Sequence, residues 1–358
     1  MTDHVLTRVA NGTGVIILDR PKALNSLSLA MVRRLTEILL AWRDDAGVAT
    51  VVLTSSSEKA LCAGGDIRFF HEAGHATPTG GSALLEDFFT EEYALNHLIH
   101  FYPKPYIALM DGVVMGGGMG IAQGGPETGL RIVTERTKMA MPEVNIGLFP
   151  DVGGSHFLSH APGQLGNYLG LTGLTIGAAD ALYLGLADVF VPSAQLSDLN
   201  ALIGATPGAQ LAAAIRARFA DGAGESALAA QRTAIDQHFG AGSVAAIMDS
   251  LAGDDSPFAQ KALSAMRQRS PLMMCVTHEM LVRGAVLNVA DCLRMERALV
   301  RRNFEHGEVL EGVRALVIDK DNTPHWNPPT LEEVTPQMVE RFFEPVWPDH
   351  AHPLRHLT

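Results

Sequence analysis

The sequence predicts an α/β protein in which strand, glycine-turn and helix units are followed by a helical C-terminal region. Short apolar runs alternate with stretches of helical periodicity up to about residue 195. Two of these runs end in glycines that open a helix, within "CAGGD" and "MGGGM". Beyond residue 195 the sequence becomes Ala-rich and helical, without a strong linker. We therefore expect an α/β core over 1–195 and a helical region over 196–358 that caps it and mediates assembly.

The first predicted elements are a hairpin, a helix and a strand. The stretch "VLTRVANGTGVIILDRP" predicts two strands joined at Asn11–Gly12, a strong hairpin signal. The stretch "LSLAMVRRLTEILLAWRDD" predicts an amphipathic helix with Ser28 as its N-cap. A strand follows in "ATVVLTSSS".

The same order of strand, glycine turn and helix recurs up to residue 141, and helices follow. A strand end, glycines and a helix are predicted over 61–74, a break in "TPTGGS", and a helix over 84–102. The stretch "PYIALMDGVVMGGGMGIAQGG" again gives a strand, a glycine turn and a helix start, and "LRIVTERTKMAM" gives a strand pair. Further helices are predicted over 207–220, 226–239 and 273–304.

Composition excludes several classes of protein. With 47% hydrophobic and 18% charged residues, the 358-residue chain can build a large core. A net charge of −12 argues against a nucleic-acid partner. No apolar run is long enough to cross a membrane, and the first residues resemble neither a signal nor a transit peptide. Three cysteines without metal spacing fit a reducing cytoplasm, where we expect the protein.

Gly65 and Gly117 are candidates for anion recognition. A strand that ends in glycines and opens a helix leaves backbone N–H groups pointing outward at the positive end of that helix. Such groups can hold an anion or a developing oxyanion. Both turns could instead be ordinary packing or phosphate turns, although neither a G-x-G-x-x-G nor a Walker-type motif is present.

Three acidic residues are candidates for catalysis or binding. Glu143 and Asp151 lie in "AMPEVNIGLFPDVGGS", which is otherwise almost entirely apolar residues, Gly and Pro. An apolar environment raises the pKa of a carboxyl group, which makes it a usable base near neutral pH. On the helix over 84–102, Glu92 leans toward the apolar stripe, with a stripe-edge position reaching solvent as the alternative.

Three motifs together resemble the crotonase (enoyl-CoA hydratase/isomerase) superfamily: "LCAGGDI", "DGVVMGGGMGIA" and "AMPEVNIGLFPDVGGSHFL". The likeness is greatest to its 3-hydroxyisobutyryl-CoA hydrolase branch. The stretches "NYLGLTG" and "EGVRALVIDKDNTPHWNPPTLEEV" resemble that branch and lie in a C-terminal extension that simple hydratases lack. The resemblance implies a crotonase-like spiral of strand-strand-helix units.

The resemblance also implies roles for the candidate residues. The N–H groups of Gly65 and Gly117 match the oxyanion hole that receives a thioester carbonyl. Glu143 matches a catalytic glutamate, and Asp151 a position that is acidic in the hydrolases and usually glycine in the hydratases. Glu92 matches a position that contacts the distal end of the substrate.

One position separates hydrolysis from hydration. Gly120 occupies the place of the second catalytic glutamate of the hydratases. Without that carboxylate, the resemblance favours hydrolysis of a short β-hydroxyacyl-CoA, foremost 3-hydroxyisobutyryl-CoA in valine catabolism. The alternatives are an enoyl-CoA or dienoyl-CoA isomerase or hydratase, and a non-catalytic crotonase-like binding protein.

The resemblance also implies which substrate, cofactors and partners to expect. The acyl-CoA thioester is the substrate, so coenzyme A enters with it, and we expect no metal or redox cofactor. His156 and His160 have helical metal spacing, but the glutamate of H-E-x-x-H is absent. We also expect a homo-oligomer that binds neither nucleic acid nor membrane.

Overall fold

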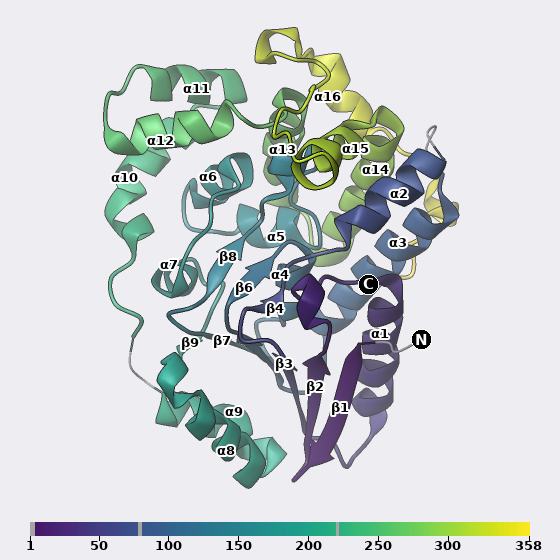
Figure 1. The fold of residues 1–358 in the computed structure, drawn as a ribbon, viewed down its shortest axis with the longest axis vertical. Helices are drawn as coiled ribbons and strands as arrows, with labels where there is room; N and C mark the ends of the chain where they lie inside the picture. Colours follow the sequence, from purple (N-terminus) through teal and green to yellow (C-terminus); the bar gives the residue numbers. More distant parts are fainter. Residues whose placement is uncertain (1–3, 78–80, 220–221) are drawn as a thin grey trace. The chain divides into compact units, whose positions relative to one another are not determined.

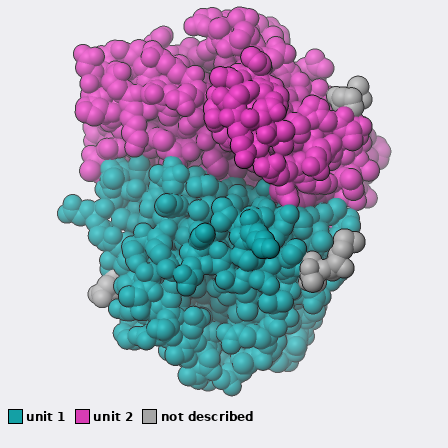
Figure 2. Space-filling view, in the orientation of Figure 1, with its two compact units in different colours: residues 1–65, 94–140, 175–229 teal, residues 66–93, 141–174, 230–358 magenta. Residues whose placement is uncertain are grey.

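A computed structural model describes residues 4–77, 81–219 and 222–358 (Figure 1). Part of the predicted "TPTGGS" break lies outside these residues. The contacts divide the chain into two compact units (Figure 2). Unit 1 comprises 1–65, 94–140 and 175–229, and unit 2 comprises 66–93, 141–174 and 230–358. The predicted boundary near residue 195 falls within unit 1.

Unit 1 is built on a six-stranded sheet of order β1-β2-β3-β5-β7-β9. Its strands are β1 (Val5–Ala10), β2 (Thr13–Leu18), β3 (Thr50–Ser55), β5 (Tyr106–Met110), β7 (Gly129–Val133) and β9 (Val189–Phe190). The first two strands are antiparallel, and every later pair in this sheet is parallel. Asn11 and Gly12 both have positive φ, as the predicted hairpin turn requires.

A three-stranded parallel sheet of order β4-β6-β8 completes the strands of unit 1. These strands are β4 (Ala60–Cys62), β6 (Val113–Met115) and β8 (Lys138–Ala140). The chain repeatedly adds one strand to the large sheet and one to the small sheet before a helix. This arrangement confirms the predicted strand-strand-helix spiral.

Two details differ from the sequence prediction. The strand expected over 105–115 is divided into β5 and β6 at Gly112, whose φ is +73°. A Cβ at Gly112 would lie 2.4 Å from the carbonyl oxygen of Lys59, so a side chain does not fit there. The strands expected as a pair over 130–141 join different sheets, because β7 pairs with β5 and β9 whereas β8 pairs with β6.

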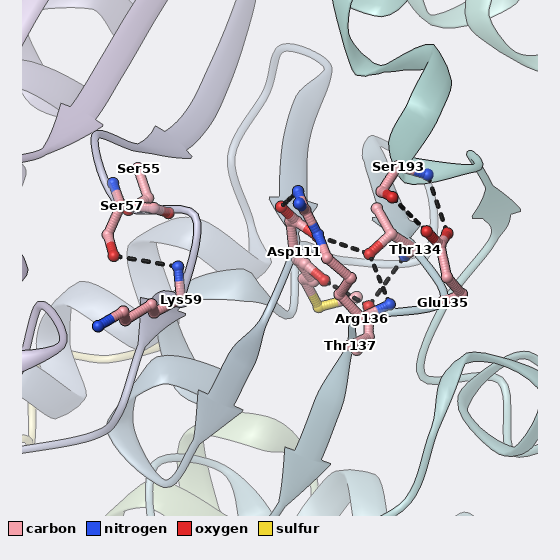
Figure 3. A network of polar contacts seen from close by, with 10 residues as sticks. Ser55, Ser57, Lys59, Asp111, Thr134, Glu135, Arg136, Thr137 and Ser193 are labelled. Atoms are coloured by element: carbon pink, nitrogen blue, oxygen red, sulfur yellow. Dashed lines mark hydrogen bonds and ion pairs between the residues drawn. The ribbon is translucent and has the colours of Figure 1, made fainter.

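A polar network fixes the corner between these two sheets (Figure 3). Asp111, directly after β5, accepts hydrogen bonds from Thr134 Oγ1 at 2.6 Å and from Arg136 Nε at 3.0 Å. Thr137 Oγ1 donates to the carbonyl oxygen of Met110 at 2.6 Å. The turn from β7 to β8 is therefore tied to the turn from β5 to β6.

Helices cover the large sheet of unit 1. The unit contains α1 (Leu29–Asp44), α4 (Gly117–Ala122), α7 (Ala178–Tyr183), α8 (Leu196–Ala205) and α9 (Gly208–Arg218). Ser28 caps α1 as predicted, since its side chain accepts from the N–H of Met31. Leu199 and Leu211, from α8 and α9, join one buried cluster with Ile107 and Ile132 of the sheet. The helices α8 and α9 thus bury one face of the parallel strands.

Unit 2 consists mainly of helices. They are α2 (Ile67–Ala76), α5 (Gly154–Ser159), α6 (Leu165–Thr172), α11 (Val244–Ala252), α12 (Pro257–Met266), α13 (Pro271–Gly284), α14 (Val289–His306), α15 (Glu308–Val313) and α16 (Pro336–Phe343). Two further helices, α3 (Ala83–His100) and α10 (Ala227–Phe239), belong partly to each unit. α13 and α14 both pack against α5 and α16.

Ser-Pro and Thr-Pro pairs start three of the helices in unit 2. Ser256, Ser270 and Thr335 each accept a hydrogen bond from a backbone N–H in the first turn, and proline follows each of them. Proline suits the first helical position, because its missing N–H would have no partner in the helix there. Across 4–77, 81–219 and 222–358, no helix combines the length and apolar character needed to span a bilayer.

Candidate active site

The two predicted glycine turns occupy equivalent positions in neighbouring strand-helix connections of unit 1. β4 and β6 are parallel with Cys62 opposite Val114. Gly65 and Gly117 each lie three residues further along, and Gly117 is the first residue of α4. In the described part of the chain, the N–H groups of both glycines donate to no protein acceptor. The structure thus brings together two free donors of the kind that the sequence predicts.

Glycine is required around both turns. Gly64 has a φ of +103° and Gly116 a φ of +50°, which side chains rarely adopt. A Cβ on Gly64 would lie 3.2 Å from the carbonyl oxygen of Met115, which is a tight contact. A Cβ on Gly118 would lie only 2.2 Å from the carbonyl oxygen of Cys62. The backbones of the two turns therefore approach more closely than side chains would allow.

Gly118→Ala tests this close approach. The added methyl group would push α4 away from β4, so we expect the free energy of unfolding to fall by about 1–3 kcal/mol. Gly204→Ala is the matched control, because Gly204 lies in α8 with no atom within 4 Å of an added Cβ. Thermal melting should show a lower Tm for Gly118→Ala and an unchanged or higher Tm for Gly204→Ala. Equal melting of Gly118→Ala and the parent would contradict the close packing.

Glu143 and Asp151 are both buried in unit 2, as the sequence predicts. Glu143 opens the short helix η2 (Glu143–Ile146), and Asp151 lies in the loop between η2 and α5. Their exposed fractions are 6% and 5%. Burial raises the pKa of Glu143 well above its usual range, and the negative charge of Asp151 raises this pKa further. Glu143 Oε2 has no hydrogen-bond partner in the described residues.

Asp151 is held by a buried tyrosine. The Tyr93 hydroxyl donates to Asp151 Oδ2 at 2.7 Å. Burial raises the pKa of Asp151 to about 6, while this hydrogen bond acts in the opposite direction. The next two residues, Val152 and Gly153, have φ values of +54° and +89°. Such a conformation is costly for a β-branched residue such as Val152, and strained positions of this kind are concentrated at functional sites.

Glu92 is buried rather than at the edge of the apolar stripe. It precedes Tyr93 on α3, and its exposed fraction is 2%. Its Oε1 atom makes no hydrogen bond with the described residues. Burial raises the pKa of Glu92 well above its usual range, and the charge of Asp151 adds to this effect. The prediction that Glu92 faces the buried side is confirmed, and the solvent-reaching alternative is wrong.

Two residues near these acids, Tyr93 and Glu296, were not identified from the sequence. Tyr93 follows Phe89 by four residues on the buried stripe of α3, and a buried tyrosine hydroxyl needs a partner. Glu296 lies on the buried face of α14, where periodicity places it with Leu293 and Val300. A glutamate among the apolar residues of this helix face could have been recognised in the sequence as a sign of a buried polar contact.

Comparison with known proteins shows the family to which the chain belongs. Residues 13–343 match the model of the enoyl-CoA hydratase/isomerase family, and the chain belongs to this family. The resemblance to the crotonase superfamily is therefore confirmed.

Two relatives that align over most of the chain are 3-hydroxyisobutyryl-CoA hydrolases. The chain is 38% identical to the mitochondrial 3-hydroxyisobutyryl-CoA hydrolase of Gallus gallus over 349 residues, which is 96% of this chain and 89% of the relative. It is 40% identical to the mitochondrial 3-hydroxyisobutyryl-CoA hydrolase of Danio rerio over 347 residues, covering 95% and 89%. The predicted likeness to this hydrolase branch is confirmed.

Two solved structures share the fold over nearly the whole chain. A carnitinyl-CoA dehydratase from Mycobacterium thermoresistibile has a TM-score of 0.90 at 40% identity, covering 96% of this chain and 97% of that chain. An enoyl-CoA hydratase from Rhodobacter sphaeroides has a TM-score of 0.86 at 39% identity, covering 96% and 98%.

Proposed function

We propose that this protein hydrolyses a short β-hydroxyacyl-CoA thioester, foremost 3-hydroxyisobutyryl-CoA, to the free acid and coenzyme A. The observation that carries the proposal is the burial of both Glu143 and Asp151. The resemblance adds that Gly120 falls at the position of the second catalytic glutamate of the hydratases. The hydrolases of Gallus gallus and Danio rerio, which align over nearly the whole chain, support it.

The proposed chemistry needs a polarised carbonyl and a carboxylate that works near neutral pH. We assign the carbonyl oxygen of the thioester to the N–H groups of Gly65 and Gly117, because negative charge develops there during attack. Loss of one such donor typically lowers the rate by about 10²- to 10³-fold. Glu143 either attacks the carbonyl carbon to give a mixed anhydride or activates a water molecule. Asp151, in its ionised form, takes up the proton that water releases and passes it to the coenzyme A thiolate, which leaves as the C–S bond breaks.

A single turnover in heavy-oxygen water separates the two routes. Direct attack by water places the label in the product acid and leaves the protein unlabelled. An anhydride that is hydrolysed at the glutamyl carbonyl places label in Glu143, and repeated turnover accumulates it there. Mass spectrometry of the peptide that contains Glu143 reads the difference.

Thiol release from 3-hydroxyisobutyryl-CoA tests the function itself. A thiol reagent should report coenzyme A from this substrate and little from an enoyl-CoA. An absorbance change with an enoyl- or dienoyl-CoA, without thiol release, would replace the hydrolase by a hydratase or an isomerase. Binding without either reaction would indicate a non-catalytic protein.

Glu92 is proposed to bind the 3-hydroxyl group of the acyl chain. Its buried Oε1 has no partner in the described residues, so a substrate hydroxyl could satisfy it. We expect Glu92→Ala to lower kcat/KM for the 3-hydroxyacyl thioester far more than for the same thioester without the hydroxyl. A site built for a hydroxyl can discriminate by about 10⁴-fold or more, because its own polar group is otherwise unpaired. Equal losses on both substrates would contradict the assignment.

The remaining expectations are also proposals. We propose that catalysis needs no metal or redox cofactor, because an oxyanion hole and carboxyl groups suffice for this hydrolysis. We propose that the enzyme is a homo-oligomer. A cytoplasmic location stays a prediction, since the named hydrolases of Gallus gallus and Danio rerio are mitochondrial.

A further inference from the structure

Glu296 is a fully buried carboxylate bound to the loop that follows Asp151. It lies on α14 with an exposed fraction of 0%. Its Oε2 accepts from the N–H of Gly153 at 2.8 Å. Its Oε1 accepts from the N–H of Ser155 at 2.9 Å and from Ser155 Oγ at 2.5 Å. All three donors come from a segment 141 to 143 residues earlier in the chain.

This segment needs an external acceptor. Helix α5 begins at Gly154, and its N-cap Gly153 has no side chain to receive the free N–H groups of the first turn. The positive φ values of Val152 and Gly153 leave the loop outside regular structure. The loop's own backbone supplies one bond, from the N–H of Gly154 to the carbonyl oxygen of Asp151 at 2.7 Å. Glu296 supplies the acceptors for Gly153 and Ser155.

We propose that Glu296 is a positioning residue that holds the strained turn after Asp151 and thereby orients the Asp151 carboxyl group. It does so from α14, so the Tyr93 hydroxyl and Glu296 fix the Asp151 loop from two separate helices. The catalytic consequence rests on the proposed thioester hydrolysis. The structural consequence, protection of the Gly153 and Ser155 amides, does not.

Several polar and titratable groups surround Glu296. The groups that face it are Tyr93 on α3, Asp151, Ser155 on α5 and Cys292 on α14, and its charge also acts on Glu143 in η2. Burial raises the pKa of Glu296 to about 8, whereas the bonds from Ser155 and Gly153 favour the ionised form. Where Glu296 is ionised, its charge raises the pKa of Glu143.

Glu308 provides a matched control for substitution. It is also a buried glutamate, with an exposed fraction of 2%, and it accepts from Ser270 Oγ and from the N–H of Asn327. The charged neighbours that shift its pKa are His306 and Glu311, not the acids near Asp151. The Glu308 side chain bonds neither Gly153 nor Ser155, so Glu308→Gln disturbs a comparable buried bond in the same unit and leaves the bonds to these two residues in place.

Glu296→Gln should lower kcat for 3-hydroxyisobutyryl-CoA by about 10- to 10²-fold, the usual effect of a small displacement of a catalytic group. KM should change little, because the loss lies in orientation. Hydrogen exchange at the Gly153 and Ser155 amides should become faster. Glu308→Gln should leave kcat and the exchange of these amides as in the parent.

Three results would overturn the inference. They are parental kcat in Glu296→Gln, unchanged exchange of the Gly153 and Ser155 amides, and the same changes in Glu308→Gln. If Glu296→Gln does not fold, Ser155→Ala decides, because it removes one donor and keeps the carboxylate. Slower turnover and faster exchange of the Ser155 amide would support the inference, and parental values would refute it. If the parent protein releases no thiol, the proposed hydrolase function is wrong. The hydrogen-exchange data then still test whether Glu296 holds the Asp151 loop.

Discussion

Glu143→Gln is expected to lower kcat by about 10³-fold or more while raising Tm above that of the parent at pH 8. The loss follows because glutamine can neither attack the thioester nor take a proton from water. The gain follows because the parent keeps an acidic group in a buried position where the charged form is unfavourable. Stability and activity should therefore change in opposite directions.

The pH dependence of the stability gain has a definite sign. The pKa of Glu143 is raised in the folded protein, so the folded state holds its proton at pH values where the unfolded chain has already released it. The contribution of Glu143 to stability is fully present below the unfolded pKa and is lost as the pH rises through the folded pKa. Glutamine does not titrate, so the advantage of Glu143→Gln should be small at pH 5 and larger at pH 8.

Glu135→Gln is a control with the opposite sign. Glu135 is exposed and accepts from the side chain and the N–H of Ser193, which lower its pKa (Figure 3). Its replacement should slightly lower Tm at pH 8 and leave kcat unchanged. Calorimetry at pH 5 and pH 8 measures Tm of Glu143→Gln and Glu135→Gln, and thiol release at the same pH values measures their kcat. A Glu143→Gln variant that keeps more than about a tenth of parental kcat would show that Glu143 is not the attacking group or base.

Local sequence signals predicted much of the fold. The Asn11–Gly12 turn and the Ser28 cap depend on residues that are neighbours in the chain, and both are present. The glycine turns at Gly65 and Gly117 were equally visible, because only glycine permits the backbones to approach there. Division of the strands into two sheets was not visible, since it depends on pairing between segments far apart in sequence. Gly112, which the sequence analysis did not weigh, marks the point where one predicted strand becomes two.

For the buried acids too, the sequence showed local features but not contacts between distant segments. Glu143 and Asp151 were predictable because their immediate neighbours are apolar. Tyr93 and Glu296 were not identified, because they reach the Asp151 loop across 58 and more than 140 residues of chain. A polar group at a core position of a helix signals that a buried partner exists, but it does not say which residue that partner is.

Asp151→Asn is expected to lower kcat by about 10²- to 10⁴-fold, the usual contribution of a positioned acid–base group. KM should change little, because the carboxyl group is proposed to act in the transition state and not in uniform binding. The fold should survive, since asparagine has the same shape and its Oδ1 can still accept from the Tyr93 hydroxyl. Thermal melting and coenzyme A affinity check that the variant is intact.

The pH profile identifies Asp151 as the titrating group. With a pKa of about 6, Asp151 becomes protonated as the pH falls through that value, so kcat/KM of the parent should decline there. In Asp151→Asn this limb should be absent. In Tyr93→Phe it should move to higher pH, because the hydroxyl bond that lowers the pKa of Asp151 is gone. If Asp151→Asn melts like the parent, binds coenzyme A and hydrolyses at the parental rate, then Asp151 takes no part in catalysis. Glu143 would then act alone, and the case for a dedicated hydrolase would depend only on the likeness of the C-terminal region.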